Sequence, residues 1–440
     1  MASTYLTKTL GTPTNNKKFT FSCWFKRSHP STTMDILHAG PDGSNEAIIC
    51  RIESDGRFTM KHDSGGSQEM LKQTNALYRD TNAWYHIVII WDTDNSTAED
   101  RQIVYFNGER ITDWMTGGND NFAGGEDILA NKAVSHTIGR RNYGGTNYVD
   151  GLLSHVHFCD GYAYAASNFG STDATTGEWK INTSPSVSYG NNGFFILKDG
   201  NSVTDQSGQG NNWTVSGGTL TKTEDNPSNV FCNWNPLIKD AATLSNGNTT
   251  SNNTSSSNWN RASGTLADTK GKYYAEFKIT TMEAAQVGII DVEQAYGTTA
   301  QVRDSSRAYM YKDNGQKGNN GSDSNYGNSF TDGDIIGIAV DLDNNKIYFS
   351  KNGTWQNSGV PTSGSTGTGS AFNLTDGYFY TFVNGNYDSS GSGKIDANFG
   401  NGYFGTTAVS SAGTNASNLG IFEYDVPTGY TALCTKGLNE

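Results

Sequence analysis

The stretch GDIIGIAVDLDNNKIYFSKNGTW, residues 333–355, decides how the second half of this chain folds. Residues 335–340 are almost wholly apolar and mostly β-branched, and residues 341–345 are rich in Asp and Asn, which favour turns. Residues 346–350 then alternate between polar and apolar side chains, and Asn352-Gly353 is a strong signal for a hairpin turn. This order predicts an antiparallel hairpin with one deeply buried strand.

The same arrangement recurs in the first half of the chain. WYHIVIIW at residues 84–91 is followed by a turn-rich segment at residues 92–95, then by IVYF at residues 103–106 and by Asn107-Gly108. We therefore interpret the chain as two β-sandwiches, each built around one such hairpin.

Length and composition agree with this interpretation. At 440 residues the chain is long enough for two domains, each of roughly 200 residues. Its 52 glycines and its low share of charged residues, 17%, suit an all-β protein, because turns need Gly, Asn and Asp. Aromatic residues make up 12% of the chain and provide material for two cores. The predicted fold class is all-β.

The charge distribution argues against two kinds of partner. The net charge is −13 and no cluster of Lys and Arg stands out, which disfavours binding to nucleic acid or to an anionic membrane surface. No apolar run approaches the length of a membrane span, so we predict no membrane insertion. The N-terminal residues lack the basic and apolar regions of a secretory signal.

We interpret the cysteines as reduced thiols in strands or packed loops. They are odd in number, widely spread and without a C-x-x-C pair. Their positions are Cys23, Cys50, Cys159, Cys232 and Cys434. No pattern in the chain indicates a cofactor, and none is predicted.

Three ordered pieces of the first half resemble a laminin-G-like domain. They are FTFSCWFKRS at 19–28, WYHIVIIWD and IVYFNGE at 84–92 and 103–109, and HTIGRR and YVDGLLSHVHFCDGYA at 136–141 and 148–163. The resemblance covers roughly residues 1 to 180. It implies a sandwich of the concanavalin A-like lectin and glucanase superfamily.

The second half is similar to a SPRY domain. The matching pieces are GKYYAEFKI at 271–279, QVGII at 286–290, DGDIIGIAVDLDNNKIYFSKNG at 332–353 and KIDANFG at 394–400. SPRY domains are distorted sandwiches of concanavalin-like character. The resemblance therefore implies two concanavalin A-like antiparallel β-sandwich domains, of the jelly-roll type, in tandem.

The predicted domain boundaries follow from these two resemblances. Residues 1–215 form the laminin-G-like sandwich, residues 216–262 a junction and linker, and residues 263–440 the SPRY-like sandwich. Pro227 and Pro236 punctuate the linker, and the polar run NGNTTSNNTSSSNWN at 246–260 is interpreted as a surface loop at the junction.

The combination of both domains resembles structural proteins of tailed bacteriophages. GQGNNWTV, DNPSN and NPL at the junction, at 208–215, 225–229 and 235–237, and PTGYTAL at 427–433 carry this likeness. It implies an exterior virion protein, a tail fibre or tail-associated adhesin that contacts host-surface glycan. Such a protein is assembled in the host cytoplasm, is a homo-oligomer and contacts other phage virion proteins. The alternative is a capsid decoration or head-fibre protein that packs against other virion proteins.

The chain lacks the paired carboxylates of the superfamily's glycoside hydrolases. Those enzymes place Glu-x-Asp-x-(x)-Glu along a strand, so that two carboxylates face a sugar. Here Glu53-Ser54-Asp55 lies in an expected turn, and Glu423-Tyr424-Asp425 runs into Val426-Pro427. We predict no enzyme and no catalytic residue. A polysaccharide depolymerase whose site combines distant residues is the further alternative.

Two groups of side chains raise the question of a metal ion. His155 and His157 are two residues apart on an expected strand and share a face, which could bind a metal on an oligomer axis. We favour the interpretation that both histidines are polar residues that face solvent, like those on the matching strand of the laminin-G-like family. Laminin-G-like domains can hold calcium in rim loops, and the first hairpin loop is acidic. Its carboxylates are those of Asp92, Asp94, Glu99 and Asp100. We favour a solvated turn, and no metal site is predicted.

Aromatic residues in polar loops are the candidate ligand-binding residues. Aromatic faces stack on sugar rings, and neighbouring Asn and Asp side chains bond to hydroxyls. The candidates are Trp114, Trp259, Tyr296, Tyr326, Trp355 and Tyr387, each near Gly, Asn or Asp. We expect some of them to form a shallow glycan site at a sandwich rim. The competing interpretation is that each covers its own hydrophobic core.

Overall fold

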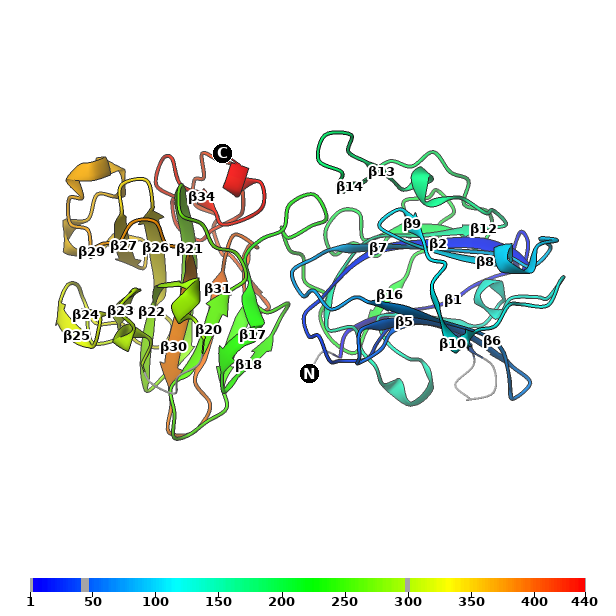
Figure 1. Cartoon of the computed structure of the whole chain (residues 1–440), viewed down its shortest axis with the longest axis horizontal. Helices are drawn as coiled ribbons and strands as arrows, with labels where there is room; N and C mark the ends of the chain where they lie inside the picture. The colour runs from blue at the N-terminus through cyan, green and yellow to red at the C-terminus, as the bar shows by residue number, and fades with distance from the viewer. Residues whose placement is uncertain (1–2, 41–46, 297–300, 440) are drawn as a thin grey trace. The chain divides into compact units, whose positions relative to one another are not determined.

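The chain divides between Lys222 and Thr223 into two units, each built almost entirely from antiparallel strands (Figure 1). The computed structural model describes residues 3–40, 47–296 and 301–439. Its helical segments are short 3₁₀ turns, and in this part of the chain no helix is long and apolar enough to cross a membrane. These turns are η1 (Ala98–Asp100), η2 (Leu129–Asn131), η3 (Tyr143–Gly145), η4 (Ala166–Asn168), η5 (Val292–Gln294), η6 (Val302–Asp304), η7 (Gln356–Ser358), η8 (Pro361–Thr366) and η9 (Gly437–Asn439). The predicted fold class of two antiparallel β-sandwiches is confirmed.

Two sheets form the first unit and share one apolar core. The larger sheet has the spatial order β10 (Trp114–Asn119), β6 (Ser67–Leu77), β5 (Arg57–Ser64), β4 (Ala47–Ile52), β3 (Met34–Ala39), β11 (Ser135–Ile138), β1 (Tyr5–Thr9), β16 (Thr214–Ser216). The smaller sheet has the order β15 (Phe194–Ile196), β12 (Gly151–Asp160), β2 (Lys18–Arg27), β7 (Tyr85–Asp92), β8 (Gln102–Phe106), β9 (Glu109–Arg110). A separate pair consists of β13 (Gly170–Thr172) and β14 (Trp179–Ile181).

Strand β2 is buried on both faces. Phe19 and Phe21 belong to the core between the sheets, as their alternation predicts. Thr20, on the opposite face, is also fully buried, because the segment that follows β12 covers it. Thr20 Oγ1 donates to the carbonyl of Tyr162 at 2.9 Å and accepts from the Tyr164 amide at 2.8 Å. The smaller sheet is therefore an interior layer.

Two further sheets form the second unit around its own core. One has the order β17 (Trp234–Asp240), β20 (Asn260–Gly264), β30 (Tyr380–Tyr387), β22 (Ala284–Asp291), β23 (Ala308–Lys312), β24 (Gln316–Asn319), β25 (Ser322–Asn325). The other has the order β18 (Ala242–Ser245), β19 (Thr250–Asn253), β31 (Lys394–Asn398), β21 (Lys272–Thr281), β26 (Ile335–Asp341), β27 (Lys346–Lys351), β28 (Thr354–Trp355). Beside it, β29 (Phe372–Asn373) pairs with β27 and β34 (Thr431–Ala432) with β21, and β32 (Tyr403–Phe404) pairs with β33 (Thr407–Ala408).

The stretch at 333–355 forms the predicted hairpin. Every residue of β26 is buried, and its pairing with β27 runs from Ile336 opposite Lys351 to Asp341 opposite Lys346. The Asp341 carboxylate accepts from the backbone and side-chain amides of Asn344 at 3.0 and 2.9 Å, which closes the turn. In the first unit β7 and β8 form the equivalent hairpin.

The polar run at 246–260 is only partly the predicted surface loop, because residues 254–259 form a loop whereas residues 250–253 form a strand. It contains strand β19, which pairs with β18 and β31 inside the second unit. Thr250 is fully buried, and its hydroxyl donates to the Asp396 carboxylate at 2.5 Å. A polar strand is stable inside a sandwich when each side chain finds a partner there, and composition does not reveal that pairing.

The predicted linker also differs from the structure. The range 216–262 is divided, because the units separate at residue 222 and strands β17 to β20 belong to the second unit. Further along, the polar, glycine-rich segment at 315–327 contains β24 and β25. Asn320-Gly321 connects these strands with φ angles of 50° and 73°, the left-handed turn that Asn-Gly favours.

Candidate ligand-binding rim

The structure brings together two of the predicted aromatic residues, Trp259 and Tyr387. Trp259 precedes β20 and Tyr387 ends β30, and these neighbouring strands pair with Asn260 opposite Asn386. The two ring centroids lie 6.1 Å apart with an interplanar angle of 38°. Both side chains are half-buried, so part of each remains open to solvent. A cross-strand aromatic pair is thus positioned at the end of a sheet.

Loop contacts hold this rim in place. The Asn253 amide donates to the carbonyl of Gly393 at 2.6 Å, which joins the end of β19 to the loop after β30. On the other side of β30, the Glu283 amide donates to the Tyr387 carbonyl at 3.2 Å. The Glu283 carboxylate accepts from the Ser389 amide at 2.8 Å. The rim is therefore fixed by hydrogen bonds on both sides of the aromatic pair.

Glu283 gives the rim an exposed acceptor. Hydrogen bonds from Ser389 lower the pKa of Glu283, so its carboxylate is ionised at neutral pH. Asn258 and Ser389 are also exposed near the rings. Two half-open aromatic faces beside amide, hydroxyl and carboxylate groups can stack on an apolar ring face and bond to its hydroxyls. We call Trp259, Tyr387, Asn258, Glu283 and Ser389 the aromatic rim.

Tyr326 and Trp355 serve the protein core. Tyr326 is only 8% exposed, belongs to the core of the second unit and donates through its hydroxyl to Gly369 O at 3.2 Å. Trp355 is half-buried, with its ring 6.4 Å from that of Tyr274. Tyr326 therefore covers its own hydrophobic core, and its burial excludes it from a shallow surface site.

Trp114 and Tyr296 lie apart from the aromatic rim. Trp114 is in the first unit, packs against the core there and has the Lys72 ammonium 5.2 Å from its ring centroid. Tyr296 is 67% exposed and follows η5 in the second unit. Neither forms a ring pair with another predicted candidate among the described residues.

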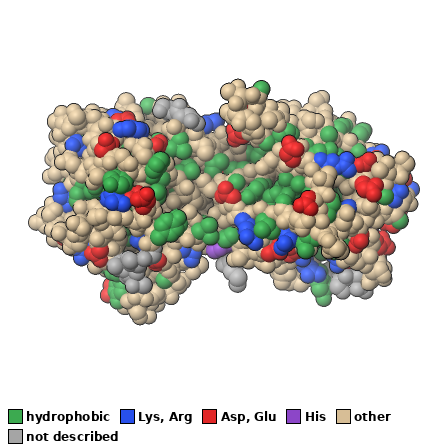
Figure 2. Space-filling model, in the orientation of Figure 1, with side chains coloured by type: hydrophobic (Ala, Val, Ile, Leu, Met, Phe, Trp, Pro, Cys, Tyr) green, Lys and Arg blue, Asp and Glu red, His purple; other side chains and the backbone are tan. Residues whose placement is uncertain are grey.

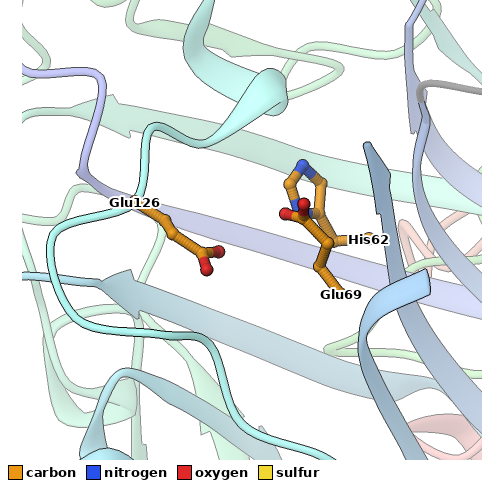
Figure 3. Close-up of side chains that lie close together, drawn as sticks. All are labelled: His62, Glu69 and Glu126. Carbon is orange, nitrogen blue, oxygen red and sulfur yellow. The ribbon is translucent and has the colours of Figure 1, made fainter. Parts of the chain in front are cut away.

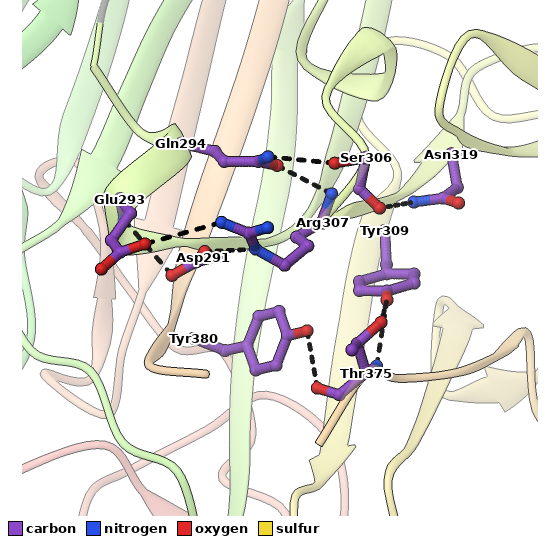
Figure 4. A network of polar contacts seen from close by, with 9 residues as sticks. All are labelled: Asp291, Glu293, Gln294, Ser306, Arg307, Tyr309, Asn319, Thr375 and Tyr380. Atoms are coloured by element: carbon purple, nitrogen blue, oxygen red, sulfur yellow. Dashed lines mark hydrogen bonds and ion pairs between the residues drawn. The ribbon is translucent and has the colours of Figure 1, made fainter. Parts of the chain in front are cut away.

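A second polar network, which the sequence did not reveal, lies around Arg307 (Figure 4). Its guanidinium is 2.5 Å from Asp291 and 3.6 Å from Glu293, and lies 4.2 Å from the ring centroid of Tyr378. The hydrogen bond with Asp291 raises the pKa of Arg307. These contacts position Phe379, the residue after Tyr378. The Phe379 side chain is 54% exposed, and its carbonyl accepts from the Val292 amide. The network thus holds an exposed aromatic ring on a fixed frame.

His155 and His157 are buried, which corrects the prediction that they face solvent. The ring of His157 stacks on that of Phe195 at 3.9 Å, and its Nδ1 is 2.9 Å from the Tyr189 hydroxyl. The ring of His155 is 5.7 Å from the same Phe195 ring. Burial lowers the pKa of His155 to about 4 and that of His157 well below its usual value. Both are neutral members of an aromatic layer.

The acidic first hairpin loop consists of separate ion pairs. Three of its four carboxylates contact different cations, in the pairs Asp92 with Lys18 at 2.8 Å, Asp94 with Lys17 at 3.6 Å and Asp100 with Arg110 at 2.6 Å. Within the described residues, donor atoms of three His, Cys, Asp or Glu side chains converge instead at His62, Glu69 and Glu126.

The acidic pairs that were considered for hydrolysis are tied to neighbouring groups. Asp55 lies in a turn, as predicted, and pairs with Arg57. The Glu423 carboxylate accepts from the Ser410 amide at 2.7 Å, and that of Asp425 from the Thr414 amide at 2.7 Å. These carboxylates stabilise loops.

Comparison with known proteins identifies two regions. Residues 2–166 match the family described as the concanavalin A-like lectin/glucanases superfamily, and residues 272–384 match the SPRY domain family. Both resemblances stated from the sequence are thereby confirmed at the level of domains. No curated protein matches the chain.

Among solved structures, the SPRY domain of human HERC1 is similar at 21% identity and a TM-score of 0.31, covering 37% of this chain and 96% of that chain. A native heptameric SAP-like pentraxin from Limulus polyphemus is similar at 16% identity and a TM-score of 0.31, covering 50% and 90%. A human SPRY domain is similar at 14% identity and a TM-score of 0.27, covering 36% and 95%.

Proposed function

We propose that the protein is an exterior structural protein of a tailed-bacteriophage virion, a tail fibre or tail-associated adhesin that contacts host-surface glycan. The single observation that carries the binding role is the half-exposed pair of Trp259 and Tyr387 beside Glu283. The order of a laminin-G-like domain, a junction and a SPRY-like domain supports the virion context by resemblance. The two matched families are compatible with carbohydrate or protein binding.

The chemistry of the aromatic rim favours binding over hydrolysis. A glycosidase needs a carboxylic acid that holds its proton at the working pH, which requires a raised pKa. Glu283 has a lowered pKa, because Ser389 donates hydrogen bonds to it. It is therefore suited to accept a bond from a sugar hydroxyl and unsuited to protonate a leaving group. We propose a non-enzymatic adhesin without a cofactor.

Several linked copies of the chain in one virion would compensate for weak binding at each site. A shallow rim with two aromatic faces buries little of a sugar, so each copy would bind weakly. Virion proteins repeat by symmetry, and linked copies can raise the overall affinity by roughly 10² to 10⁴. Homo-oligomerisation and contact with other virion proteins are therefore part of the proposal. Acidic and basic side chains are interspersed on the face in Figure 2, so this face presents no continuous basic stripe of the kind that binds nucleic acid.

The test uses the full chain, labelled and applied to host cells and to an array of defined glycans. We expect adsorption to host cells and retention by one glycan class, with a loss of about tenfold or more in Trp259→Ala and Tyr387→Ala. Tyr296→Ala is the matched control, because it removes an exposed aromatic ring outside the rim. Absence of adsorption and of glycan binding by the wild-type chain would overturn the adhesin role.

The exposed ring of Phe379 supports the alternative of a capsid decoration or head-fibre protein. Apolar side chains that remain exposed on a fixed frame suit contact with another protein. Phe379 is 54% exposed and Leu237 71% exposed in the second unit. Immunogold labelling of intact particles distinguishes the two locations: label on the tail supports the adhesin, and label on the capsid supports decoration. Release of reducing sugar from host polysaccharide would instead indicate a depolymerase.

A further inference from the structure

Three side chains of the first unit converge at the rim of its core (Figure 3). His62 lies on β5, Glu69 on β6 and Glu126 in the loop that follows β10. One ligand atom from each lies within 4.8 Å of the others. This is an imidazole nitrogen and two carboxylate oxygens around one point, outside the aromatic rim and outside the acidic hairpin loop.

The His62 imidazole is buried and lacks a hydrogen-bond partner at Nδ1. Its exposed fraction is 2%, and Nδ1 faces Glu69 Oε2 at 3.5 Å, which is longer than a hydrogen bond. Glu126 Oε2 is likewise buried without a hydrogen-bond partner. A buried polar atom without a hydrogen-bond partner destabilises the folded state. Two such atoms, in residues whose ligand atoms converge, indicate a ligand between them.

A β-bulge places Glu69 beside His62. His62 pairs with Met70, but the next residue, Asp63, pairs with Gln68, so Glu69 is an extra residue between two pairs. In a regular antiparallel ladder the neighbour of Met70 would point to the opposite face from His62. Bulges reorient side chains and are frequent next to functional sites. The regular pairing of β5 and β6 is thus interrupted at Glu69, the residue that completes the cluster.

Glu126 is positioned through its backbone. The Thr93 hydroxyl donates to the carbonyl of Glu126 at 2.6 Å, and the preceding Gly125 amide donates to the carbonyl of Thr93 at 2.8 Å. The Phe122 ring lies 5.2 Å from that of His62 and is buried. The loop therefore brings a carboxylate to the cluster and shields one side of it.

The electrostatics suit a cation. Burial lowers the pKa of His62 to about 4. The charge of Asp63 raises this pKa and that of Lys132 lowers it, but both effects are smaller than that of burial. The imidazole is therefore neutral at neutral pH. A neutral imidazole is the form that binds a metal. Burial and the charge of Glu69 raise the pKa of Glu126. The charge of Lys132 is shared with Asp127, 3.9 Å away.

We propose that His62 Nδ1, Glu69 and Glu126 bind one divalent transition-metal ion, for which Zn²⁺ is the best fit. Imidazole nitrogen with carboxylate oxygens is a donor set for Zn²⁺ and its neighbours, whereas Ca²⁺ and Mg²⁺ prefer oxygen alone. Bonds of about 2.0 to 2.2 Å require the two Glu side chains to close around His62. Glu69 is exposed and Glu126 half-buried, which leaves both side chains room to rotate. Water would complete the coordination.

The test begins with the full chain after dialysis against EDTA. We expect calorimetric titration with ZnCl₂ to show one Zn²⁺ per chain and Co²⁺ to give visible absorption that Zn²⁺ displaces. Glu69→Gln and Glu126→Gln keep the side-chain shapes and should weaken Zn²⁺ binding by at least about tenfold. Glu99→Gln, in the acidic hairpin loop, is the matched control and should bind as the wild type does.

Three outcomes would overturn the proposal. They are no Zn²⁺ binding by the wild-type chain, unchanged affinity in both Glu69→Gln and Glu126→Gln, and binding of Ca²⁺ at these residues without any response to Zn²⁺. Circular dichroism of each variant confirms that it is folded. Because His62 is buried, His62→Gln is a supporting variant only if it passes that check. The result is independent of the glycan test, since the two sites share no residue.

Discussion

The indole ring of Trp179 lies against Gly108. A Cβ atom at Gly108 would lie 2.4 Å from two carbon atoms of that ring. Gly108 forms the turn between β8 and β9 with φ of 82°, and Trp179 Nε1 donates to His86 Nδ1 at 2.9 Å. The turn at Gly108 therefore packs closely against the segment that carries Trp179. A side chain at Gly108 would push the two apart.

Replacing Gly108 with Ala should destabilise the first unit by about 3 kcal/mol. Positive φ costs an L-residue about 1 to 2 kcal/mol, and the overlap with the indole adds to that cost. Gly117→Ala is the control, since its φ is 78° but nothing lies within 4 Å of the added atom. Urea unfolding followed by tryptophan fluorescence measures both variants. Equal losses in the two would show that the ring contact adds nothing.

Glu276 should make the second unit less stable as pH rises. It is fully buried, and its carboxylate accepts from the amides of Glu423 and Tyr424 at 2.8 Å. Burial nevertheless raises the pKa of Glu276 to about 7. The folded state then holds the proton more tightly than the unfolded state, so this contribution is complete below about pH 4.5 and is lost as pH rises through 7. The expected loss from pH 4.5 to 8 is roughly 3 kcal/mol.

Glu276→Gln cannot titrate and should remove this part of the pH dependence. Hydrogen exchange of the β21 amides between pH 5 and 8 measures it, corrected for intrinsic exchange. Glu293→Gln removes a charge from an exposed side chain of the same unit and serves as control. If wild type and Glu276→Gln keep the same difference in stability at every pH, Glu276 does not titrate in this range.

Thr250→Val should destabilise the second unit by about 1.5 to 3 kcal/mol. Asp396 is buried and accepts from the hydroxyls of Thr250 and Thr280, so the variant removes a bond to a buried carboxylate. Thr243→Val on the adjacent strand changes an exposed side chain and should stay within about 0.5 kcal/mol of the wild type. Chemical unfolding compares them. A cost at Thr250 no larger than at Thr243 would contradict the buried placement of β19.

The thiols of Cys23, Cys50 and Cys159 should react slowly in the native protein. All three are buried, and burial raises the pKa of each, which suppresses the reactive thiolate. Alkylation with iodoacetamide followed by peptide mapping should label them at least about a hundredfold faster after denaturation than before it. Rapid labelling of any of the three in the folded chain would contradict its burial.

Much of the fold was accessible from local patterns. An apolar run, an Asx-rich break and Asn-Gly predicted both central hairpins, and the alternation of apolar and polar residues in β2 agrees with the place of Phe19 and Phe21 in the core. The same Asn-Gly signal at Asn320-Gly321 was present but surrounded by polar residues, so β24 and β25 were missed. Strand β19 was missed for the same reason, because its polar side chains are satisfied by a strand distant in the sequence.

The candidate sites were less accessible. Trp259 and Tyr387 were each identified as aromatic residues in polar loops, but their pairing depends on the register of β20 and β30. Tyr326 fitted the same local pattern, yet it is buried. No local signal joined His62 to Glu69, since the bulge between them appears only in the ladder of β5 and β6.

Short-range chemistry in the amino-acid order was thus enough to establish two antiparallel sandwiches, their hairpins and their apolar interiors, because turns and alternation act between neighbouring residues. Which polar strands are buried, which aromatic rings meet and where an imidazole faces two carboxylates depends on pairing between distant strands. That pairing is decided by the register of whole sheets and by a single bulge, and these form only when all strands compete for partners in the folded chain.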